Sequence, residues 1–339
     1  MAEIKSYLNY IKEACDCNLS WDRLHNTNIL ITGATGLIGS CLVDILMQKN
    51  VAGLNVYAAG RNVERASARF KQYSSNKNFH FIKYDVTNTL NSSICFDYII
   101  HAASNASPNF FKQFPVEVIA SNIYGVDNLL KYGKEHGMKR FLYVSTGEVY
   151  GEGDGRVYRE DYSGYIDCTN PRSCYPSSKR AAETLCSAYV TEYGVDAVIA
   201  RPSHTYGPYF TESDNRVYAQ FIRNVLDNED IILKSTGEQY RSWCFVVDCA
   251  QALLYVLLNG KTGEAYNIAD ATSNITIKQL AEMVAEIGGK KVVMKLPDTP
   301  DNNKIITKAT FDTNKLQALG WKISGNMKEK MTSTIKESY

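Results

Sequence analysis

The chain has 339 residues, of which 45% are hydrophobic and 22% charged, as expected for one large α/β domain with an attached lobe. Its formal net charge of +1 gives no overall field that would attract nucleic acid or an anionic membrane. The first residues lack the apolar run of a signal peptide, and no segment approaches the roughly 20 apolar residues of a membrane helix, so we expect a cytoplasmic protein.

The nine cysteines are scattered along the chain. Cys15 and Cys17 form the closest pair, and no Cys-x-x-Cys motif occurs. This spacing predicts neither a zinc site nor a disulfide framework, and it favours a reducing compartment.

An amphipathic helix is predicted over residues 3–15, where apolar side chains recur at helical spacing. We assign it to an N-terminal extension of residues 1–27, which packs on the main domain or forms a dimer contact. Its predicted apolar face consists of Ile4, Leu8, Ile11 and Ala14.

Short apolar segments recur along residues 28–202, and helical segments lie between most of them. Because alternating strands and helices build a parallel sheet that is covered on both faces, we predict an α/β Rossmann fold with a doubly wound parallel sheet. The predicted strands are 28–32, 56–59, 79–84, 98–103, 141–145 and 196–200.

The alternation of strands and helices loosens after about residue 203. We predict a smaller interwoven α/β lobe that binds substrate, formed by residues 203–241 and 271–339. Residues 242–270 are expected to return to the dinucleotide-binding domain of residues 28–202. The elements predicted in this half are strands at Trp243–Val247 and Ala265–Ile268 and a helix at Ile277–Ile287.

A glycine-rich segment, Thr32-Gly33-x-x-Gly36-x-x-Gly39, follows the first predicted strand and opens a predicted helix. Glycines permit a tight turn and a close approach of the backbone to a pyrophosphate, and the helix N-terminus supplies free N–H groups. We therefore predict a dinucleotide-binding loop. Its contact residues are expected to be Gly33, Thr35, Gly36, Leu37, Ile38 and Gly39.

The second predicted strand ends in Ala59-Gly60-Arg61-Asn62, which holds no carboxylate. NAD enzymes usually carry an acid there for the ribose 2′-hydroxyl, whereas an arginine suits the 2′-phosphate of NADP. Arg61 could also stack on the adenine, so the cofactor is NAD or NADP. Asp85, after the third predicted strand, is a candidate for the adenine edge or a cap of the following turn.

Tyr175 and Lys179 are four residues apart, which places them on one face of a predicted helix. A phenol is a poor base at its ordinary pKa of about 10, and a neighbouring ammonium lowers that pKa. Tyr175 could then remove a hydroxyl proton while hydride passes to a nicotinamide, and Lys179 could hydrogen-bond the nicotinamide ribose.

From residue 28 to the C-terminus, the chain resembles the extended short-chain dehydrogenase/reductase family of nucleotide-sugar epimerases, dehydratases and decarboxylases. This resemblance implies a nucleotide-diphosphate sugar as substrate, a homodimer, and a bound dinucleotide that is regenerated in each turnover. It rests on the glycine loop, His101-Ala102-Ala103, Asn122 with Gly125 and Asn128, the segment from Ser145 to Gly151, Tyr175 with Lys179, Arg201-Pro202 leading to Tyr206-Gly207-Pro208, and the segment from Arg241 to Asp248.

The resemblance implies roles for residues at the matching positions. Thr146 would hydrogen-bond the sugar 4-hydroxyl, Tyr175 would be the base, and Lys179 would lower its pKa. Arg241 would bind the substrate diphosphate, and Glu148 would act on the C5 proton or orient a neighbour. Further dinucleotide contacts are implied for Val86, Ala102, Ala103, Ser104 and Arg201, and further substrate contacts for Ser107, His204 and Arg216.

Several segments are most similar to UDP-glucuronate decarboxylases, and Glu148 matches a glutamate that these enzymes share with 4,6-dehydratases. Gly147 departs from both groups, because decarboxylases have Ser there and dehydratases an Asp that protonates the leaving 6-hydroxyl. His204 replaces an asparagine, and we expect a neutral, hydrogen-bonded histidine. Tyr209 replaces an arginine. The similar segments are Ala106-Ser107-Pro108, Pro171 to Tyr175, Asp214 to Val217, and Arg241 to Cys244.

We therefore predict a nucleotide-sugar lyase that works through a transient 4-keto sugar, with decarboxylase-like or 4,6-dehydratase-like chemistry. A 4- or 5-epimerase is the alternative, in which Glu148 positions the substrate or shuttles the C5 proton. A non-catalytic module that binds nucleotide sugar or dinucleotide is a remote alternative, and the presence of Thr146, Tyr175 and Lys179 argues against it.

Overall fold

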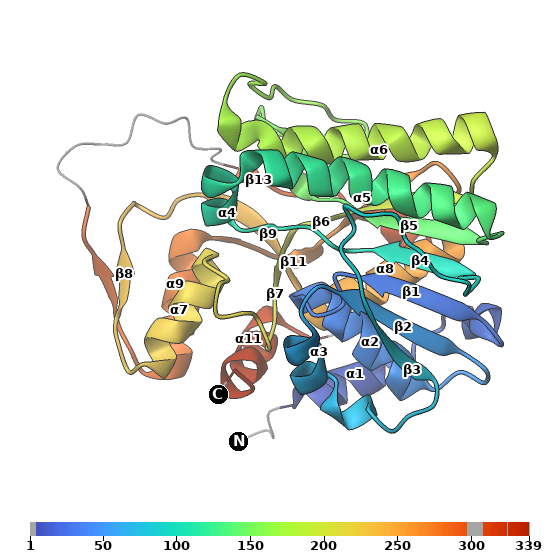
Figure 1. The fold of residues 1–339 in the computed structure, drawn as a ribbon. Coiled ribbons are helices and arrows are strands. Elements are labelled where there is room, and N and C mark those ends of the chain that lie inside the picture. Colours follow the sequence, from blue (N-terminus) through green and yellow to red (C-terminus); the bar gives the residue numbers. More distant parts are fainter. Residues whose placement is uncertain (1–4, 297–307, 324, 339) are drawn as a thin grey trace.

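The structure is a computed structural model that describes residues 5–296, 308–323 and 325–338. A seven-stranded parallel sheet forms its centre (Figure 1). The chain enters at the middle of this sheet, winds to one edge and then returns to build the other, so the prediction of a doubly wound Rossmann fold is confirmed. In spatial order the strands are β3 (Phe79–Lys83), β2 (Asn55–Gly60), β1 (Asn28–Thr32), β4 (Tyr98–His101), β5 (Arg140–Val144), β6 (Ala197–Pro202) and β10 (Ala265–Ile268).

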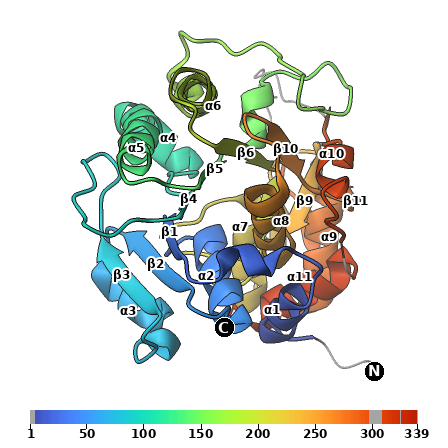
Figure 2. The ribbon, with the colours of Figure 1, turned by 90° about the vertical axis from the view of Figure 1, so that its right-hand side faces the viewer.

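Helices cover both faces of the sheet, as Figure 2 shows. The middle strands are consequently buried on both sides: Ile29 and Ile31 of β1 join one hydrophobic cluster, and Leu30 joins the other. This explains why the strands have continuous apolar sequences. One face carries α2 (Leu37–Lys49) and α8 (Val246–Asn259), and the other carries α5 (Pro115–Glu135) and α6 (Cys174–Tyr193). Shorter helical segments of this domain are η1 (Trp21–Leu24), α3 (Val63–Arg69), η2 (Lys71–Tyr73), α4 (Pro108–Gln113), η3 (Gly147–Tyr150) and η4 (Pro171–Ser173).

The N-terminal helix α1 (Tyr7–Cys15) packs on the parent domain, against α2 and α8. Ile11 and Ala14 of the predicted apolar face are buried, but Leu8 is 61% exposed, so its placement on that face is wrong. Tyr7 and Tyr10 are buried instead, because the packed face is rotated toward these rings. Ile4 lies outside the described residues.

A buried carboxylate in α2 ties the first helix to the rest of the domain. Asp44 accepts hydrogen bonds from the hydroxyls of Tyr7, at 2.7 Å, and Tyr73, at 3.0 Å, and it pairs with the Arg69 guanidinium. A buried carboxylate is stable only when such partners replace its lost water. We refer to Asp44, Tyr7, Arg69 and Tyr73 as the Asp44 hub.

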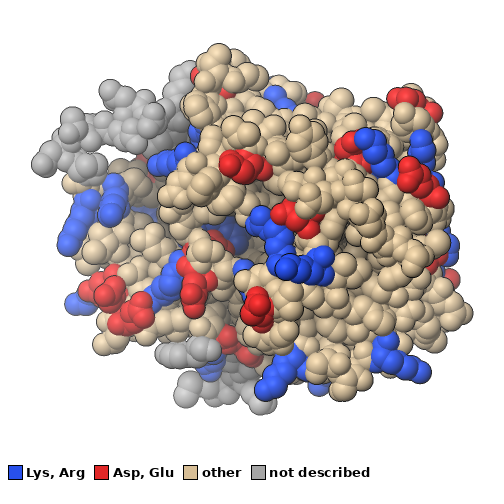
Figure 3. All heavy atoms as spheres, viewed as in Figure 1, with Lys and Arg blue, Asp and Glu red and all other residues tan. Residues whose placement is uncertain are grey.

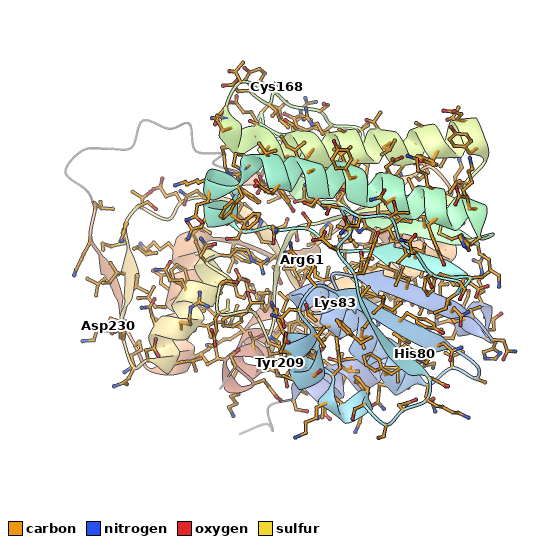
Figure 4. The ribbon with its side chains drawn as sticks, in the orientation of Figure 1. Arg61, His80, Lys83, Cys168, Tyr209 and Asp230 are labelled. Atoms are coloured by element: carbon orange, nitrogen blue, oxygen red, sulfur yellow. The ribbon has the colours of Figure 1, made fainter. Side chains whose placement is uncertain are left out.

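The Asp44 hub also contacts the loop after β7 (His204–Tyr206) and the C-terminal segment. Tyr209 has a left-handed backbone with φ of 64°, and its ring lies under the Arg69 guanidinium, 4.9 Å from the ring centroid. The Tyr209 hydroxyl donates to Glu337, which also accepts from the Tyr7 backbone N–H. Figure 4 shows Tyr209 between α3 and α11 (Met327–Lys336).

A second, smaller sheet lies in the predicted lobe. Its central strand is β9 (Tyr240–Phe245), and its other members are β7, β11 (Asp270–Thr276) and β13 (Lys308–Ala309). A capping box of Thr276 and Gln279 begins α9 (Ile277–Gly288) at the predicted place. The remaining elements are α7 (Val217–Leu226), the paired strands β8 (Ile231–Leu233) and β12 (Val292–Met294), and α10 (Asn314–Gln317).

One predicted strand belongs to a different sheet from the one expected. Ala265–Ile268 joins the main sheet as predicted, but Trp243 to Phe245 lie in β9 of the small sheet, and Val246 and Val247 begin α8. Only the helix returns to the main domain at this point. A short apolar run reveals burial, but it does not reveal which sheet supplies the neighbouring strands.

Within the described part of the chain, every helix is too short or too polar to span a lipid bilayer.

A buried ion pair joins α8 to α11. The Lys330 ammonium is fully buried and lies 2.6 Å from a carboxylate oxygen of Asp248. Burial raises the pKa of Asp248 to about 6, although the charge of Lys330 opposes this shift. The buried Asp248 carboxylate and the buried Lys330 ammonium therefore each stabilise the charged form of the other.

We expect Asp248→Asn to destabilise the protein by about 3–5 kcal/mol, because it leaves the Lys330 ammonium buried without an anion. The paired replacement Asp248→Leu with Lys330→Met is expected to cost less, since it removes both charges. Urea unfolding at pH 7 measures both effects. A loss below about 1 kcal/mol for Asp248→Asn would contradict this account of the pair.

Candidate active site

A cavity of about 1380 Å³ lies at the carboxyl ends of the main strands and is lined by residues of both the sheet domain and the lobe. All the predicted cofactor, substrate and catalytic residues except Arg201 line it. Positively and negatively charged side chains are interspersed on this face of the molecule (Figure 3), on which Arg61 lies (Figure 4).

The glycine loop forms one wall of this cavity. Gly33 has φ of 68°, and a Cβ atom there would lie 2.7 Å from the Ala102 carbonyl oxygen and from the Ala103 backbone. A Cβ atom on Gly39 would lie 2.3 Å from the Gly33 oxygen. Only glycine allows the loop to lie this close to β4, and the N-terminus of α2 opens toward the cavity. This wall fits a dinucleotide pyrophosphate.

Two guanidinium groups stand at the end of β2. Arg61 lies 3.9 Å from Asp85, and Arg65 donates to the Thr35 carbonyl oxygen at 2.6 Å. Asp85 also accepts from the backbone and hydroxyl of Thr87, so it caps the turn as well as lining the cavity. The sequence analysis did not identify Arg65, which reaches the cavity because it lies one helical turn beyond Arg61.

Lys179 is buried at the base of the opposite wall. Its ammonium donates to the Val144 carbonyl oxygen at 2.8 Å and lies 5.8 Å from the centroid of the Tyr175 ring. Burial lowers the pKa of Lys179 to about 7, against the opposing charge of Glu183. The lysine is therefore anchored to the end of β5.

Tyr175 is also buried, and burial raises the pKa of its phenol. The charge of Glu148 raises this pKa further, whereas a hydrogen bond with Thr146 and the charges of Arg216 and Arg172 lower it. The prediction that Lys179 lowers the pKa of Tyr175 is not confirmed, since its ammonium is directed to Val144. The structure does bring Thr146, Glu148 and Tyr175 together.

Arg172 and Phe111 are site residues to which the sequence analysis gave no role. The Arg172 guanidinium lies 3.0 Å and 3.2 Å from the two Glu148 oxygens and 4.7 Å from the centroid of the Phe111 ring. Phe111 in turn stacks on Tyr175, with ring centroids 4.6 Å apart. These contacts link the position of Glu148 to that of Tyr175. The similarity of the segment from Pro171 to Tyr175 to decarboxylases could have indicated Arg172 as a site residue.

The lobe contributes further basic residues to the cavity. Arg216 pairs with Asp214 at 2.5 Å, and Arg241 lines the same wall. His204 opens to the cavity, and burial together with the charges of these two arginines lowers its pKa to about 4. This lowered pKa favours the neutral form of His204, while the expected hydrogen bond of its ring stays a prediction. Ser107 reaches across to the lobe and donates to Asn215 at 3.1 Å.

Arg201 lies behind the cavity wall, and its assignment to the dinucleotide is corrected. Its guanidinium pairs with Glu183 at 2.7 Å and 3.0 Å and also donates to the Tyr150 hydroxyl and the Glu160 carbonyl oxygen. These contacts occupy the side chain in supporting α6 and η3. The motif Arg201-Pro202 correctly marks the strand end, but not the direction of the side chain.

Among the described residues, no group of three His, Cys, Asp or Glu side chains is placed to hold a metal ion. The nine cysteines are all free thiols.

The fold and this site define an enzyme of the class that modifies nucleotide sugars on a dinucleotide-binding domain. The pattern of the NAD dependent epimerase/dehydratase family matches residues 29–269, and the chain belongs to that family. The prediction of this family is confirmed.

Relatives within this family include several decarboxylases. The chain is 36% identical over 309 residues to UDP-glucuronic acid decarboxylase 6 of Arabidopsis thaliana. This alignment covers 90% of this chain and 86% of that protein. It is 32% identical over 316 residues to UDP-glucuronic acid decarboxylase 1 of Xenopus tropicalis, covering 91% and 71%.

Crystal structures of other family members have the same fold. The UDP-glucose 4-epimerase of Thermotoga maritima with UDP-glucose is 26% identical, with a TM-score of 0.78 and coverage of 91% of this chain and 98% of that chain. The dTDP-glucose 4,6-dehydratase of Bacillus anthracis in complex with NAD is 22% identical, with a TM-score of 0.78 and coverage of 92% and 96%.

Proposed function

We propose that this protein is a nucleotide-sugar lyase that oxidises C4 of a nucleotide-linked hexuronic acid transiently and releases the C5 carboxylate as carbon dioxide. The observation that carries the proposal is the grouping of Thr146, Glu148 and Tyr175 on one wall of a cavity whose other wall is the glycine loop. The names of the decarboxylase relatives make UDP-glucuronic acid the first substrate to test.

Tyr175 would take the proton of the sugar 4-hydroxyl, and Thr146 would hold the same oxygen through its hydroxyl. A bound nicotinamide would supply the hydride acceptor and later return the hydride. Burial raises the pKa of Tyr175 and opposes this proton transfer, whereas the hydrogen bond with Thr146 and the nearby arginine charges offset part of that rise. The anchored Lys179 would fix the geometry at the base of the site.

Oxidation at C4 makes a C5 carboxylate the carboxylate of a β-keto acid. When the C5–C6 bond breaks and C6 leaves as carbon dioxide, the electron pair of that bond moves through C5 to the C4 oxygen, where Thr146 and Tyr175 would stabilise the negative charge. A proton then adds to C5 to restore the ketone. Glu148, held by Arg172, stands next to these groups and would position the sugar or carry that proton.

The arginines suit an anionic substrate. Arg216 and Arg241 lie in the lobe wall, where a diphosphate would bind, and Arg172 lies beside Glu148 near the sugar. Guanidinium groups bind phosphate and carboxylate oxygens through paired hydrogen bonds. A nucleotide-diphosphate hexuronic acid presents both kinds of anion.

For the dinucleotide, we propose NADP rather than NAD. No carboxylate stands at the end of β2 to bind a ribose 2′-hydroxyl, whereas Arg61 and Arg65 both line the cavity there. A 2′-phosphate would find two cations within this part of the site. The NAD named for the Bacillus anthracis dehydratase is a property of that protein.

An epimerase acting at C4 or C5 is the second candidate. Neither an epimerase nor a decarboxylase needs an acid at position 147, so Gly147 is compatible with both. The similarity to a UDP-glucose 4-epimerase fits the epimerase alternative. Both candidates begin with oxidation at C4, and only the fate of the C5 substituent separates them.

We further propose that the protein forms a homodimer through the outer face of α5. Phe114, Val116 and Ile119 are exposed there, Val116 by 73%. A second copy rotated by a twofold axis would cover this face with the same residues. Figure 1 shows α5 and α6 side by side as the outer layer of the main domain.

The decisive measurement is mass spectrometry of products from UDP-glucuronic acid and UDP-glucose incubated with the purified enzyme. We expect loss of the mass of carbon dioxide from the first compound. Tyr175→Phe is expected to lower turnover by on the order of 100-fold or more while dinucleotide still binds, because the proton acceptor is removed.

Tyr193→Phe, an exposed tyrosine of the same helix, serves as the matched control and should retain activity. A product of unchanged mass with altered sugar configuration would contradict the proposed lyase activity and support the epimerase activity instead. Near-normal activity of Tyr175→Phe would remove this residue as the base.

Cofactor choice is tested by calorimetric titration of stripped protein with NADP+ and NAD+. We expect NADP+ to bind at least about tenfold more tightly, and Arg61→Ala to abolish that preference, since one charge-assisted contact is worth about 1.4 kcal/mol or more. Arg156→Ala, at an exposed arginine outside the cavity lining, is the control. Equal or tighter binding of NAD+ by the unaltered protein would contradict the proposal.

Light scattering during gel filtration tests the dimer. The unaltered protein is expected to have the mass of two chains, and Val116→Asp combined with Ile119→Asp to have the mass of one, because buried unpaired carboxylates oppose association. Lys131→Ala on the same helix is expected to remain dimeric. A monomeric unaltered protein would refute the homodimer.

A further inference from the structure

Gly147 lies between Thr146 and Glu148, which are proposed to act on the sugar. The ring of Phe311, a residue distant in the sequence, fills the space beside it. A Cβ atom on Gly147 would lie 2.1 Å from Cζ of Phe311, 2.8 Å from Cε2 and 3.1 Å from Cε1. No real Cβ atom approaches a ring so closely. The Phe311 ring therefore occupies the space into which any side chain at position 147 would project.

The Phe311 ring is held firmly in this position. It is 6% exposed and packs edge-on against Tyr150, with ring centroids 5.6 Å apart, and against Tyr158 at 5.9 Å. Its backbone N–H donates to the Ser242 hydroxyl at 3.1 Å. The backbones of Tyr158 and Thr310 are joined by a hydrogen bond of 2.7 Å, which ties the two chain segments together beside the ring. These contacts oppose a movement of the ring away from Gly147.

The wall that results is aromatic and holds no carboxylic acid. Gly147, Tyr158, Ala309 and Phe311 all line the cavity next to Thr146. The one polar group of these side chains is the Tyr158 hydroxyl, and burial raises the pKa of this phenol. A phenol with a raised pKa is a far weaker acid than a carboxyl group. Glu148, the carboxylate next to Gly147 in the sequence, is engaged by Arg172.

Such a wall discriminates between two reactions of a 4-keto sugar, one that removes the hydroxyl from C6 and one that removes C6 itself as carbon dioxide. Loss of a 6-hydroxyl breaks a carbon–oxygen bond, and the departing oxygen takes the electron pair, so an acid must deliver a proton to it. Loss of a carboxylate breaks a carbon–carbon bond, and carbon dioxide leaves neutral while the electron pair stays with the sugar. An apolar wall suits the second departure and does not assist the first.

We propose that Gly147 and Phe311 form a specificity-determining pair, an apolar wall beside the C5 substituent that permits release of carbon dioxide and prevents elimination of water. This inference rests on the proposed C4 oxidation and specifies which substituent the site releases. Phe311 acts on substrate choice by contact with the departing group, while Thr146 and Tyr175 act on C4.

The test uses the full-length enzyme with UDP-glucuronic acid and UDP-glucose, and products are separated by mass. The variants are Gly147→Asp, Phe311→Ala, and the two combined. We expect the unaltered enzyme to release carbon dioxide and not water. The combined variant, which has both an acid and the room for it, should eliminate water from UDP-glucose on the order of 100-fold faster than the unaltered enzyme.

Gly147→Asp alone should gain no elimination, because Phe311 blocks the new side chain, and Phe311→Ala alone should gain none, because it has no acid. Tyr193→Phe, at an exposed tyrosine outside the cavity lining, is the control and should retain release of carbon dioxide. Calorimetric binding of UDP and the ultraviolet absorbance of reduced nicotinamide establish that each variant is folded and oxidises C4.

Two outcomes would overturn the proposed role of Gly147 and Phe311 in specificity. One is elimination by Gly147→Asp alone at the rate of the combined variant. The other is a combined variant that binds UDP and oxidises C4 without eliminating water. If the unaltered enzyme changes only the configuration at C4, the decarboxylase proposal fails, whereas elimination by the combined variant would still support the wall.

Discussion

The close approach of Gly33 to the backbone of Ala102 and Ala103 is the contact on which both halves of the site depend. Because no side chain separates the two segments, the loop between β1 and α2 lies directly against the end of β4. On the other side of β4, strand β5 ends at Val144, which anchors the ammonium of Lys179. The pyrophosphate loop and the catalytic wall are thus both aligned with neighbouring strands of one sheet. Their separation is set by the spacing of strands rather than by flexible loops.

The parts of the fold that sequence reasoning predicted correctly are those with local causes. Strands such as Asn28–Thr32 are buried on both faces, so their continuous apolar sequence is visible without knowledge of the neighbours. The glycine loop is equally local, since the turn and the helix start are encoded within eight residues. The grouping of Thr146, Glu148 and Tyr175 was implied by the family resemblance, and the structure brings these residues together around one cavity.

The parts that were missed depend on contacts between distant segments. Nothing near Gly147 in the sequence indicates that Phe311 fills its side-chain space, and nothing near Arg201 indicates that Glu183 holds its guanidinium away from the cavity. The apolar run at Trp243 signals burial, yet the choice of sheet is made by pairing with β11 and β13. The pKa of Tyr175 likewise depends on burial and on several charges at once, which a four-residue spacing to a lysine does not describe.

The Asp44 hub also governs when the molecule can finish folding. Glu337, which binds Tyr7 and Tyr209, lies 330 residues after Tyr7 in the chain. Translation proceeds from the N-terminus at about 5–20 residues per second, so the first helix waits many seconds for its final partner. The nascent chain therefore carries an unfinished junction until Glu337 has been synthesised, and a chain that stops before this residue would leave the junction open for recognition by chaperones and proteases.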